Sequence, residues 1–316
     1  MSFPPRWLRQ RSLTIPRDEV SFERRRFACR DSRARERLER AAGAVLDGYH
    51  AALEAEEEVE LAGAIRGVEA DLRGFACEGA AMALTLLDRL SPWRASRWQA
   101  FLTGAGADHP YMLHVGAGLA LARMRRKLQL PKEEFDPLLG WLVADGYGFH
   151  EGFFHAEEVA RGGIPSRVVG YARRAFDQGV GRSLWFSCGA DTEAIAGRIE
   201  AMPLERRPDL WSGVGLACAY AGGMERPGIE ALRSRAERFA PELAQGAAFA
   251  AQARARARNP SPATDLACRA LCRCDAASAA AETVRALDGL PPDGEVPSFE
   301  AWRRRIQARF AGRATE

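Results

Sequence analysis

The segment Gly213-Val214-Gly215-Leu216-Ala217 decides how this chain is built, because its pattern of glycine followed by small and apolar residues returns along the sequence. Successive copies mostly begin about 30–40 residues apart, a period typical of stacked helical hairpins. We interpret each copy as the start of a helix. The similar segments are Gly79-Ala80-Ala81-Met82-Ala83, Gly116-Ala117-Gly118-Leu119-Ala120, Gly148-Phe149-His150-Glu151-Gly152, Gly179-Val180-Gly181-Arg182-Ser183 and Gly246-Ala247-Ala248-Phe249-Ala250.

Apolar residues at helical spacing predict an all-α protein of about twelve to fourteen helices, built as stacked antiparallel helical hairpins in a solenoid-like bundle. Only residues 183–188 have the pattern of a short extended segment. We expect an irregular, basic lead at 1–26, a single all-helical domain at 27–290, and a loop with an amphipathic helix at 291–316. Within the domain, the helices are expected to include 31–66, 68–90, 111–125, 133–144, 167–178, 191–201, 205–221 and 241–257.

The repeated glycines predict close contact between helices. A helix interior disfavours glycine by about 1 kcal/mol relative to alanine, so the repetition indicates a compensating benefit. Small residues let neighbouring backbones touch. The alternative is a phosphate-binding turn at a helix N-terminus, but no Gly-Lys-Ser/Thr sequence follows any of these segments.

Composition narrows the class of protein. The 316 residues include 45 basic and 42 acidic side chains, for a net charge of +3, and Lys127 and Lys132 are the only lysines. The excess of arginine over lysine is typical of a GC-rich genome. Because basic and acidic side chains nearly balance, we predict no nucleic-acid partner. The sequence contains neither a secretory signal nor a membrane-spanning apolar run, so we expect a cytoplasmic protein without membrane insertion.

Seven cysteines point to reduced, buried thiols. Cys268, Cys272 and Cys274 lie close together in the sequence, but they match no standard zinc or iron–sulfur spacing. Their role stays open.

Histidines and aromatic residues identify the candidate site. Four of the five histidines lie between positions 109 and 155, in 109–114 and 145–155, and both segments are rich in aromatic side chains. His150 and His114 are the candidate proton-transfer residues, with Glu151 beside the first. Glu78, among small apolar residues, is a candidate buried carboxylate of raised pKa, and Arg73, Arg182 and Arg207 are its candidate partners. The alternatives are a hydrogen-bonded core histidine and an internal ion pair.

A metal site is a weaker option. On a continuous helix, Glu151, His155 and Glu158 would lie on one face, where they could hold a metal ion. The alternative is a surface stripe with one ion pair. We otherwise expect no metal or cofactor, since His150-Glu151-x-x-x-His155 lacks the histidine spacing of zinc proteases.

Aromatic residues near the glycines could form an apolar wall for a conjugated ligand or could be simple repeat packing. The candidate pocket residues are Phe75, Tyr111, Tyr147, Phe149, Phe153, Trp185 and Trp211. The sequence contains no nucleophile elbow, Walker loop, dinucleotide fingerprint or kinase motif.

Several long segments resemble a bacterial family of unknown function, domain-of-unknown-function family 1702, whose UnbL-like members are encoded beside enediyne polyketide synthases. The resemblance covers most of residues 35–290. The segments that carry it are Arg73-Gly74-Phe75, Glu78-Gly79-Ala80, Tyr111-Met112, His114-Val115-Gly116, Asp145-Gly146-Tyr147-Gly148-Phe149-His150-Glu151-Gly152, Gly181-Arg182-Ser183-Leu184-Trp185-Phe186, Asp209-Leu210-Trp211-Ser212-Gly213-Val214-Gly215-Leu216-Ala217 and Gln245-Gly246-Ala247-Ala248-Phe249-Ala250.

This resemblance implies a secondary-metabolism accessory protein that acts on or shelters a polyene or polyketide intermediate during enediyne-type core maturation. Its partners would be that hydrophobic small molecule and possible biosynthetic partner proteins. The alternative is a noncatalytic helical-repeat scaffold that docks a biosynthetic partner. The sequence leaves open whether the protein is an enzyme.

Overall fold

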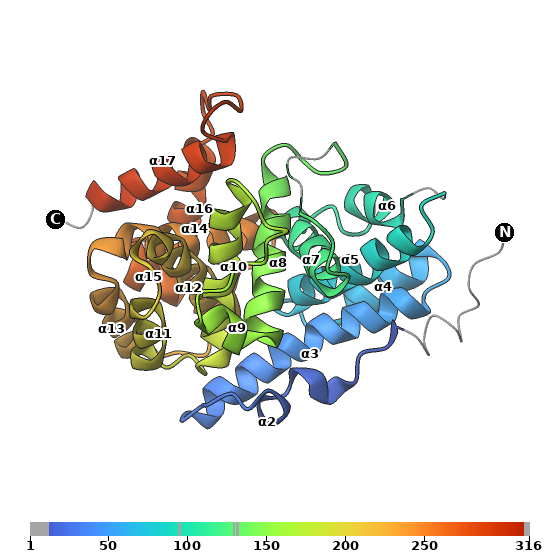
Figure 1. Cartoon of the computed structure of the whole chain (residues 1–316), viewed down its shortest axis with the longest axis horizontal. Helices are drawn as coiled ribbons and strands as arrows, with labels where there is room; N and C mark the ends of the chain where they lie inside the picture. The colour runs from blue at the N-terminus through green and yellow to red at the C-terminus, as the bar shows by residue number, and fades with distance from the viewer. Residues whose placement is uncertain (1–12, 94–95, 129, 131–132, 313–316) are drawn as a thin grey trace.

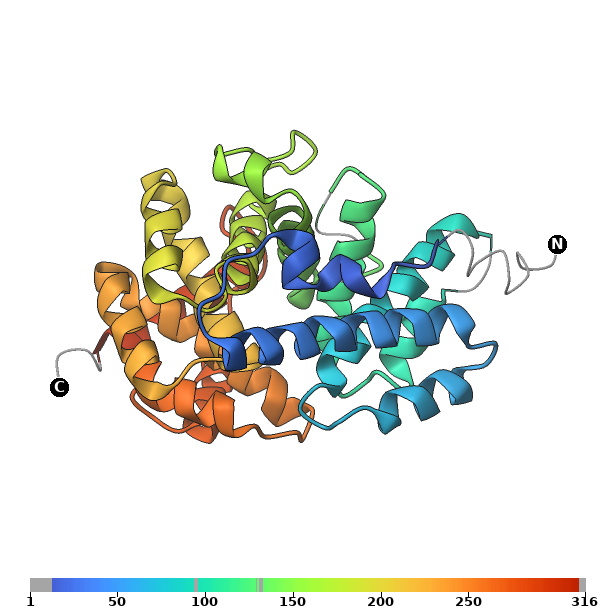
Figure 2. The same cartoon turned by 90° about the horizontal axis from the view of Figure 1, so that it is seen from below.

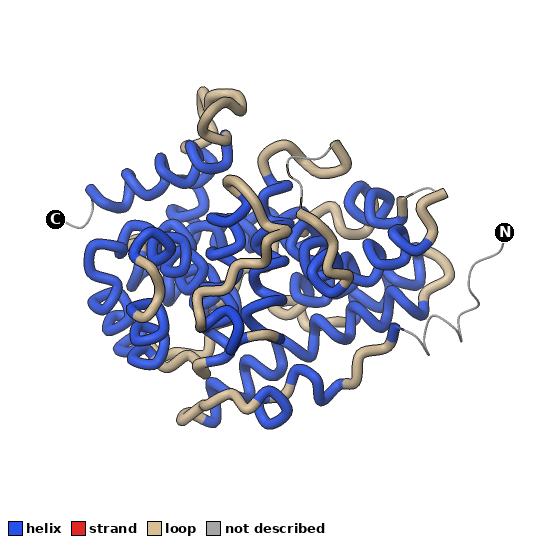
Figure 3. The backbone as a smooth tube through the Cα atoms, viewed as in Figure 1, coloured by secondary structure: helices blue, strands red, loops and turns tan. Residues whose placement is uncertain are grey.

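The computed structural model describes residues 13–93, 96–128, 130 and 133–312, and within them the chain forms helices and no strand (Figure 3). The all-α prediction is therefore confirmed. Helices α2 to α17 lie in these residues, and α2 (Phe22–Arg25) and α9 (Ala156–Ala160) are single turns. The longer helices match the expected number. None of the described helices is both long and apolar enough to cross a membrane.

Eight helices form a row in which each packs against the next, running across the molecule from the blue to the orange end in Figure 1. We call them the core helices. Helices α11 (Thr192–Glu200), α13 (Arg226–Ala236) and α15 (Pro262–Leu271) lie between core helices in the sequence and contact one another in a second row. The core helices are α3 (Ser32–Glu54), α5 (Arg73–Leu90), α7 (Pro110–Arg123), α8 (Leu142–Phe154), α10 (Ala172–Ser187), α12 (Arg207–Ala221), α14 (Ala240–Arg256) and α16 (Ala276–Arg285).

Pairs of glycines set the distance between neighbouring core helices. A Cβ on Gly179 of α10 would overlap the carbonyl oxygen of Asp145, and one on Gly148 of α8 would overlap that of Phe176, both well inside 3.0 Å. Each glycine thus faces the carbonyl that lies three residues before its partner glycine. The backbones touch, as predicted. The same reciprocal relation holds for Gly48 and Gly79, Gly118 and Gly146, Gly181 and Gly213, and Gly215 and Gly246.

Neighbouring core helices run in the same direction. Arg174, in the first turn of α10, donates from Nε to Asp209 Oδ2, in the first turn of α12, at 2.9 Å. At the other end, Phe153 and Phe186, in the last turns of α8 and α10, have ring centroids 6.2 Å apart. First turns meet first turns and last turns meet last turns. This is the arrangement of a repeat in which the intervening segment returns the chain to the same end.

Several details of the prediction are wrong. The expected helix 31–66 is divided into α3 and α4 (Glu58–Gly67), because Ala55 has an extended backbone conformation. The paired glycines lie in helix interiors rather than at helix starts, because the apolar segment extends to both sides of them: α10 begins at Ala172, seven residues before Gly179. Residues 183–188 are helical through Ser187 and are not extended. In place of a helix at 133–144, a 3-10 turn (Leu139–Trp141) leads directly into α8.

The described parts of both flanking segments pack against the core helices. In the described part of the N-terminal lead, a 3-10 turn (Arg17–Val20) and α2 lie along α3 (Figure 2), and Tyr49 donates to the Leu13 carbonyl at 2.8 Å. The described part of the expected irregular lead, from residue 13 onward, therefore covers α3. At the other end, α17 (Ser298–Gly312) begins at Ser298 and packs Trp302 against Phe249, with ring centroids 4.6 Å apart.

Candidate functional site

A small, mostly apolar cavity of about 60 Å³ lies among α3, α5, α8 and α10, beneath the N-terminal segment. Phe75, Phe149 and Phe153 contribute aromatic rings to its wall, and Ile15 and Val20 cover it. Among the described residues that line it, Glu78, His150 and Arg182 carry the polar groups. A cavity of this size has room for a few water molecules or for part of a slender ligand.

Glu78, Asp145 and Arg182 form a buried ion triad at the wall of the cavity. Arg182 Nη1 donates to Asp145 Oδ1, and Arg182 Nη2 lies 3.6 Å from Glu78 Oε1. All three side chains are at most 6% exposed. Burial raises the pKa of Glu78 to about 7 against the opposing charge of Arg182, and the negative charge of Asp145 adds to the rise. Glu78 is thus poised to gain or lose a proton near neutral pH.

Glu78 also has an unsatisfied oxygen. Its Oε2 atom is buried and has no hydrogen-bond partner. Leaving a buried polar atom unpaired costs free energy, so such atoms are rare unless a ligand or water completes them. Because Glu78 lines the cavity, a molecule that enters can pair with this oxygen.

The triad continues into a chain of hydrogen bonds across the core helices. Gln178 Nε2 donates to Asp145 Oδ2 at 2.8 Å, and Ser212 Oγ lies 3.1 Å from Gln178 Oε1 and 2.9 Å from Gln245 Oε1. Arg303 of α17 then donates from Nε to Gln245 Oε1 at 3.3 Å and from Nη2 to Asp209 at 2.6 Å. Asp145, Gln178, Ser212 and Gln245 each directly precede a glycine that contacts the neighbouring core helix. The repeat therefore places one polar residue in line on each of α8, α10, α12 and α14.

His150 and Glu151 lie at the C-terminal end of α8, next to the cavity. His150 lines it and is 6% exposed, and its Nδ1 atom lies 3.7 Å from Glu151 Oε1 without a hydrogen-bond partner. Burial lowers the pKa of His150 despite the neighbouring carboxylate. Burial alone would raise the pKa of Glu151, but His150, His155 and Arg167 outweigh it and the pKa is lowered. Glu151 therefore stays ionised beside a neutral imidazole.

His114 is placed away from this cavity. Its Nδ1 atom lies 2.7 Å from the Pro110 carbonyl oxygen, and its Nε2 accepts from the Asp136 backbone N–H at 3.3 Å. This assigns a neutral ring protonated at Nδ1. Its ring packs edge-on against Trp98, with centroids 5.3 Å apart. His114 is thus placed as a hydrogen-bonded core histidine, and it lacks access to the cavity.

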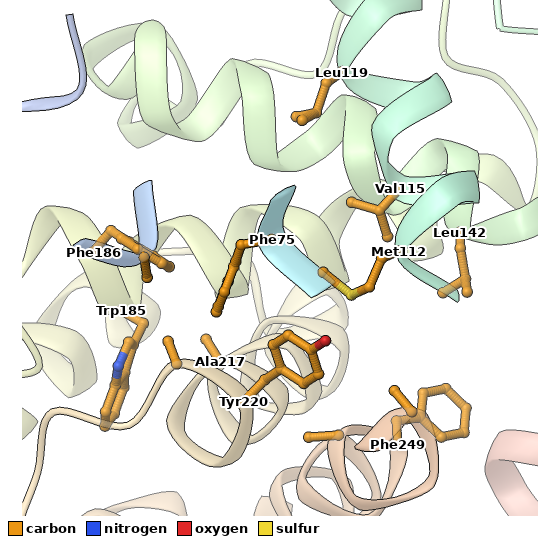
Figure 4. Close-up of a cluster of buried hydrophobic side chains, with 14 of the residues drawn as sticks. Phe75, Met112, Val115, Leu119, Leu142, Trp185, Phe186, Ala217, Tyr220 and Phe249 are labelled. Carbon is orange, nitrogen blue, oxygen red and sulfur yellow. The ribbon is translucent and has the colours of Figure 1, made fainter. Parts of the chain in front are cut away.

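Four of the predicted pocket residues are also placed elsewhere, because each packs in a different contact. Trp185 donates from its indole N–H to the Gly222 carbonyl at 2.9 Å and points into the core (Figure 4). Trp211 is buried in α12, and Tyr111 packs against the core from α7. Tyr147 pairs its hydroxyl with Arg167. None of the four lines the cavity, which leaves Phe75, Phe149 and Phe153 as its predicted aromatic residues.

The predicted stripe of Glu151, His155 and Glu158 does not form. Helix α8 ends at Phe154, and His155 has φ −128° and ψ 39°, so Glu158 lies in the separate helix α9 and is exposed. Glu151 and His155 still lie close to each other, and His150 rather than Glu158 is the third residue of the cluster. The donor atoms of these three residues lie within 4.8 Å of one another.

The clustered cysteines lie apart from these residues. Cys268 and Cys272 face carbonyl oxygens of α14.

Sequence reasoning missed several residues of the site. Asp145 stands in a quoted segment, but its pairing with Arg182 joins two helices and leaves no local pattern. Ile15 and Val20 were assigned to an irregular lead, although their apolar side chains in a basic segment are a signal of packing. Met82, Leu119 and Phe186 look like ordinary core residues.

A second, more open groove of about 620 Å³ lies on the opposite faces of α8 and α10. Arg25, Arg26, Arg161 and Arg198 line it. None of the predicted site residues does, and the smaller cavity is the one that gathers them.

Comparison with known proteins identifies a family. The model of a family described as "Protein of unknown function (DUF1702)" matches residues 5–310. No curated protein and no solved structure matches the chain.

Proposed function

The chain belongs to the DUF1702 family, and from its cavity we propose that it binds an elongated, apolar, unsaturated small molecule and transfers a proton at that molecule through Glu78. The observation that carries this proposal is the meeting of Glu78, Arg182 and His150 in a buried, phenylalanine-lined cavity. Polyenes and other polyketide intermediates have the matching chemistry. They are slender and conjugated, and water or stray protons can damage them.

Different residues of the cavity support ligand binding and proton transfer. The rings of Phe75, Phe149 and Phe153 provide apolar contact with a conjugated chain. Glu78 exchanges protons near neutral pH because its pKa is raised to about 7. Arg182 Cζ lies 5.0 Å from the centroid of the Phe149 ring, so the guanidinium is held between ring and carboxylates. A proton can then move at a bound carbon or oxygen while bulk water is excluded.

The cavity of this structure holds only part of such a chain. At about 60 Å³, a longer ligand requires the N-terminal cover to move, because Ile15 and Val20 close that side. The cover is held at Leu13 by Tyr49 and at Phe22 by the Glu39 carboxylate, which accepts its N–H at 2.8 Å. We propose that this segment opens for entry and closes over the bound molecule.

In the cell, the protein would serve the cytoplasmic maturation of an enediyne-type core in bacteria. The seven cysteines carry free thiols, which suits a reducing compartment. The protein would act as an accessory to a polyketide synthase, with biosynthetic proteins as partners. A scaffold without a ligand is the competing function, and the experiment below separates the two.

The test fills the cavity from its α3 side. We would titrate the protein with a conjugated tetraene fatty acid whose fluorescence rises in apolar surroundings. Ala42→Leu and the smaller Ala42→Val extend into the cavity, and Ala231→Leu on exposed α13 is the matched control. We expect Ala42→Leu to weaken binding by at least about tenfold, equivalent to about 1.4 kcal/mol, and the control to leave it unchanged.

Equal binding by folded Ala42→Leu and the control would overturn the cavity as the ligand site. In a producing strain, replacing the gene by the Glu78→Gln form should cause an unsaturated intermediate to accumulate. Full product from that strain would favour the scaffold instead.

A further inference from the structure

Three metal-binding side chains converge where α8 ends. The donor atoms of His150, Glu151 and His155 all lie within 4.8 Å of one another. Among the described residues these form the one histidine, cysteine or carboxylate group of this kind. Two imidazoles and one carboxylate make a donor set that proteins use for Zn²⁺, Fe²⁺ and similar ions.

The end of the helix creates this meeting. On a continuous helix, residues five apart point in different directions, so His150 and His155 would diverge. Here His155 leaves the helix while its N–H still donates to the Glu151 carbonyl at 2.8 Å. Its ring returns to within 6.0 Å of the His150 ring, centroid to centroid.

A second observation points to a missing ligand. His150 is 6% exposed, and its Nδ1 atom has no hydrogen-bond partner. The neighbouring carboxylate oxygen Glu151 Oε1 lies 3.7 Å from this nitrogen, beyond hydrogen-bond range. A buried nitrogen aimed at a carboxylate that it does not bond is the arrangement that an ion between them would satisfy.

We propose that His150 Nδ1, the Glu151 carboxylate and a ring nitrogen of His155 hold one divalent transition-metal ion of the Zn²⁺ or Fe²⁺ class. Metal–nitrogen and metal–oxygen bonds of about 2.0–2.2 Å would draw the three donors together. His155 is half-exposed and gives the ion a path from solvent. His150 also lines the apolar cavity, so the ion lies at the cavity wall with coordination positions left open. The metal site does not depend on the proposed ligand.

The positive charges around the site do not prevent binding. Arg167 Nη2 lies 3.4 Å from Glu151 Oε1, and Tyr147 bonds the same guanidinium. A hydrogen bond to one oxygen of a ligating carboxylate is a common outer-shell contact, and it fixes the orientation of the carboxylate. The Arg167 side chain is 28% exposed, so it can also turn toward solvent as the ion enters.

The test uses Co²⁺ as the probe, because its visible absorption reports nitrogen and oxygen coordination. The full chain, stripped with a chelator, would be titrated with Co²⁺ alongside His155→Ala, Glu151→Gln and the control Glu158→Gln. His155 lies outside α8, so its replacement should spare the fold, which circular dichroism checks. Elemental analysis of protein purified without chelator identifies the native ion.

We expect one Co²⁺ per chain in the wild type and in Glu158→Gln. His155→Ala and Glu151→Gln should each weaken binding by at least about tenfold, the smallest loss common even for outer-shell changes. Failure of the wild type to bind one Co²⁺ per chain, or unchanged binding in both folded ligand variants, would overturn the site. Since the readout is metal content, this result is separate from binding of the tetraene.

Discussion

Arg182 Nη2 lies 3.6 Å from Glu78 Oε1 while Nη1 of the same guanidinium donates to Asp145, so one buried cation serves two buried carboxylates. If both acids were ionised, the triad would carry a net negative charge in the core, which burial opposes. Protonation of Glu78 removes this net negative charge. This is the physical reason for a pKa of about 7, and it makes the triad sensitive to pH.

Glu78→Gln should change how stability depends on pH. The folded pKa of about 7 lies above the usual value of 4.5, so the contribution of Glu78 is fully present below pH 4.5 and is lost as pH rises through 7. Relative to the glutamine variant, the wild type should lose up to about 3 kcal/mol of unfolding free energy over that window, at about 1.4 kcal/mol per pH unit. Urea unfolding at several pH values measures this difference. Parallel pH curves for the two proteins would show that folding does not shift the pKa of Glu78.

Arg182→Ala should destabilise the protein strongly. The change leaves Glu78 and Asp145 buried without their cation, a loss that costs about 3–5 kcal/mol in other proteins. Arg226→Ala is the control, because its pair with Glu230 is exposed and is worth less than about 1 kcal/mol. Chemical denaturation compares them. A small effect of Arg182→Ala would mean that both acids protonate or that water enters the site.

Gly179→Ala should separate α8 from α10. The added Cβ would overlap the Asp145 carbonyl oxygen, so we expect a loss of about 3 kcal/mol or more from overpacking. Gly43→Ala in α3 is the control, since no atom lies within 4 Å of its added Cβ, and it should gain about 0.5–1 kcal/mol. Thermal unfolding distinguishes them. Equal effects would show that the glycine pairs do not set the helix spacing.

The repeat could be predicted from the sequence because close packing leaves a local mark. Gly148 and Gly179 must lack a side chain wherever two backbones touch, so the spacing of the glycines reports the spacing of the helices. The boundaries could not be predicted in the same way. Gly179 lies mid-helix because Ala172 already begins α10, and nothing in the apolar run distinguishes a helix centre from its start.

The site was predictable only in part, for a similar reason. His150 and Glu78 carry polar groups in apolar segments, and this local contrast identified two residues that line the cavity. His114 shows the same contrast, but its partners are Pro110 in the preceding turn and the Asp136 backbone. The packing of distant helices decides whether a polar residue faces a cavity or forms hydrogen bonds with the nearby backbone. A single sequence does not contain that information.

His114 and His150 should therefore respond differently to the same replacement. His114→Leu removes the partner of the Pro110 carbonyl and of the Asp136 N–H, which should cost about 1–3 kcal/mol of stability and leave tetraene binding unchanged. His150→Leu loses no hydrogen bond to its Nδ1 atom but changes the cavity wall, so it should alter tetraene affinity with a smaller effect on unfolding. Denaturation and fluorescence titration of both variants measure the two effects separately. Loss of tetraene binding in a folded His114→Leu protein would show that His114 belongs to the ligand site. A residue that only packs in the core should not affect the affinity for a ligand that other helices bind.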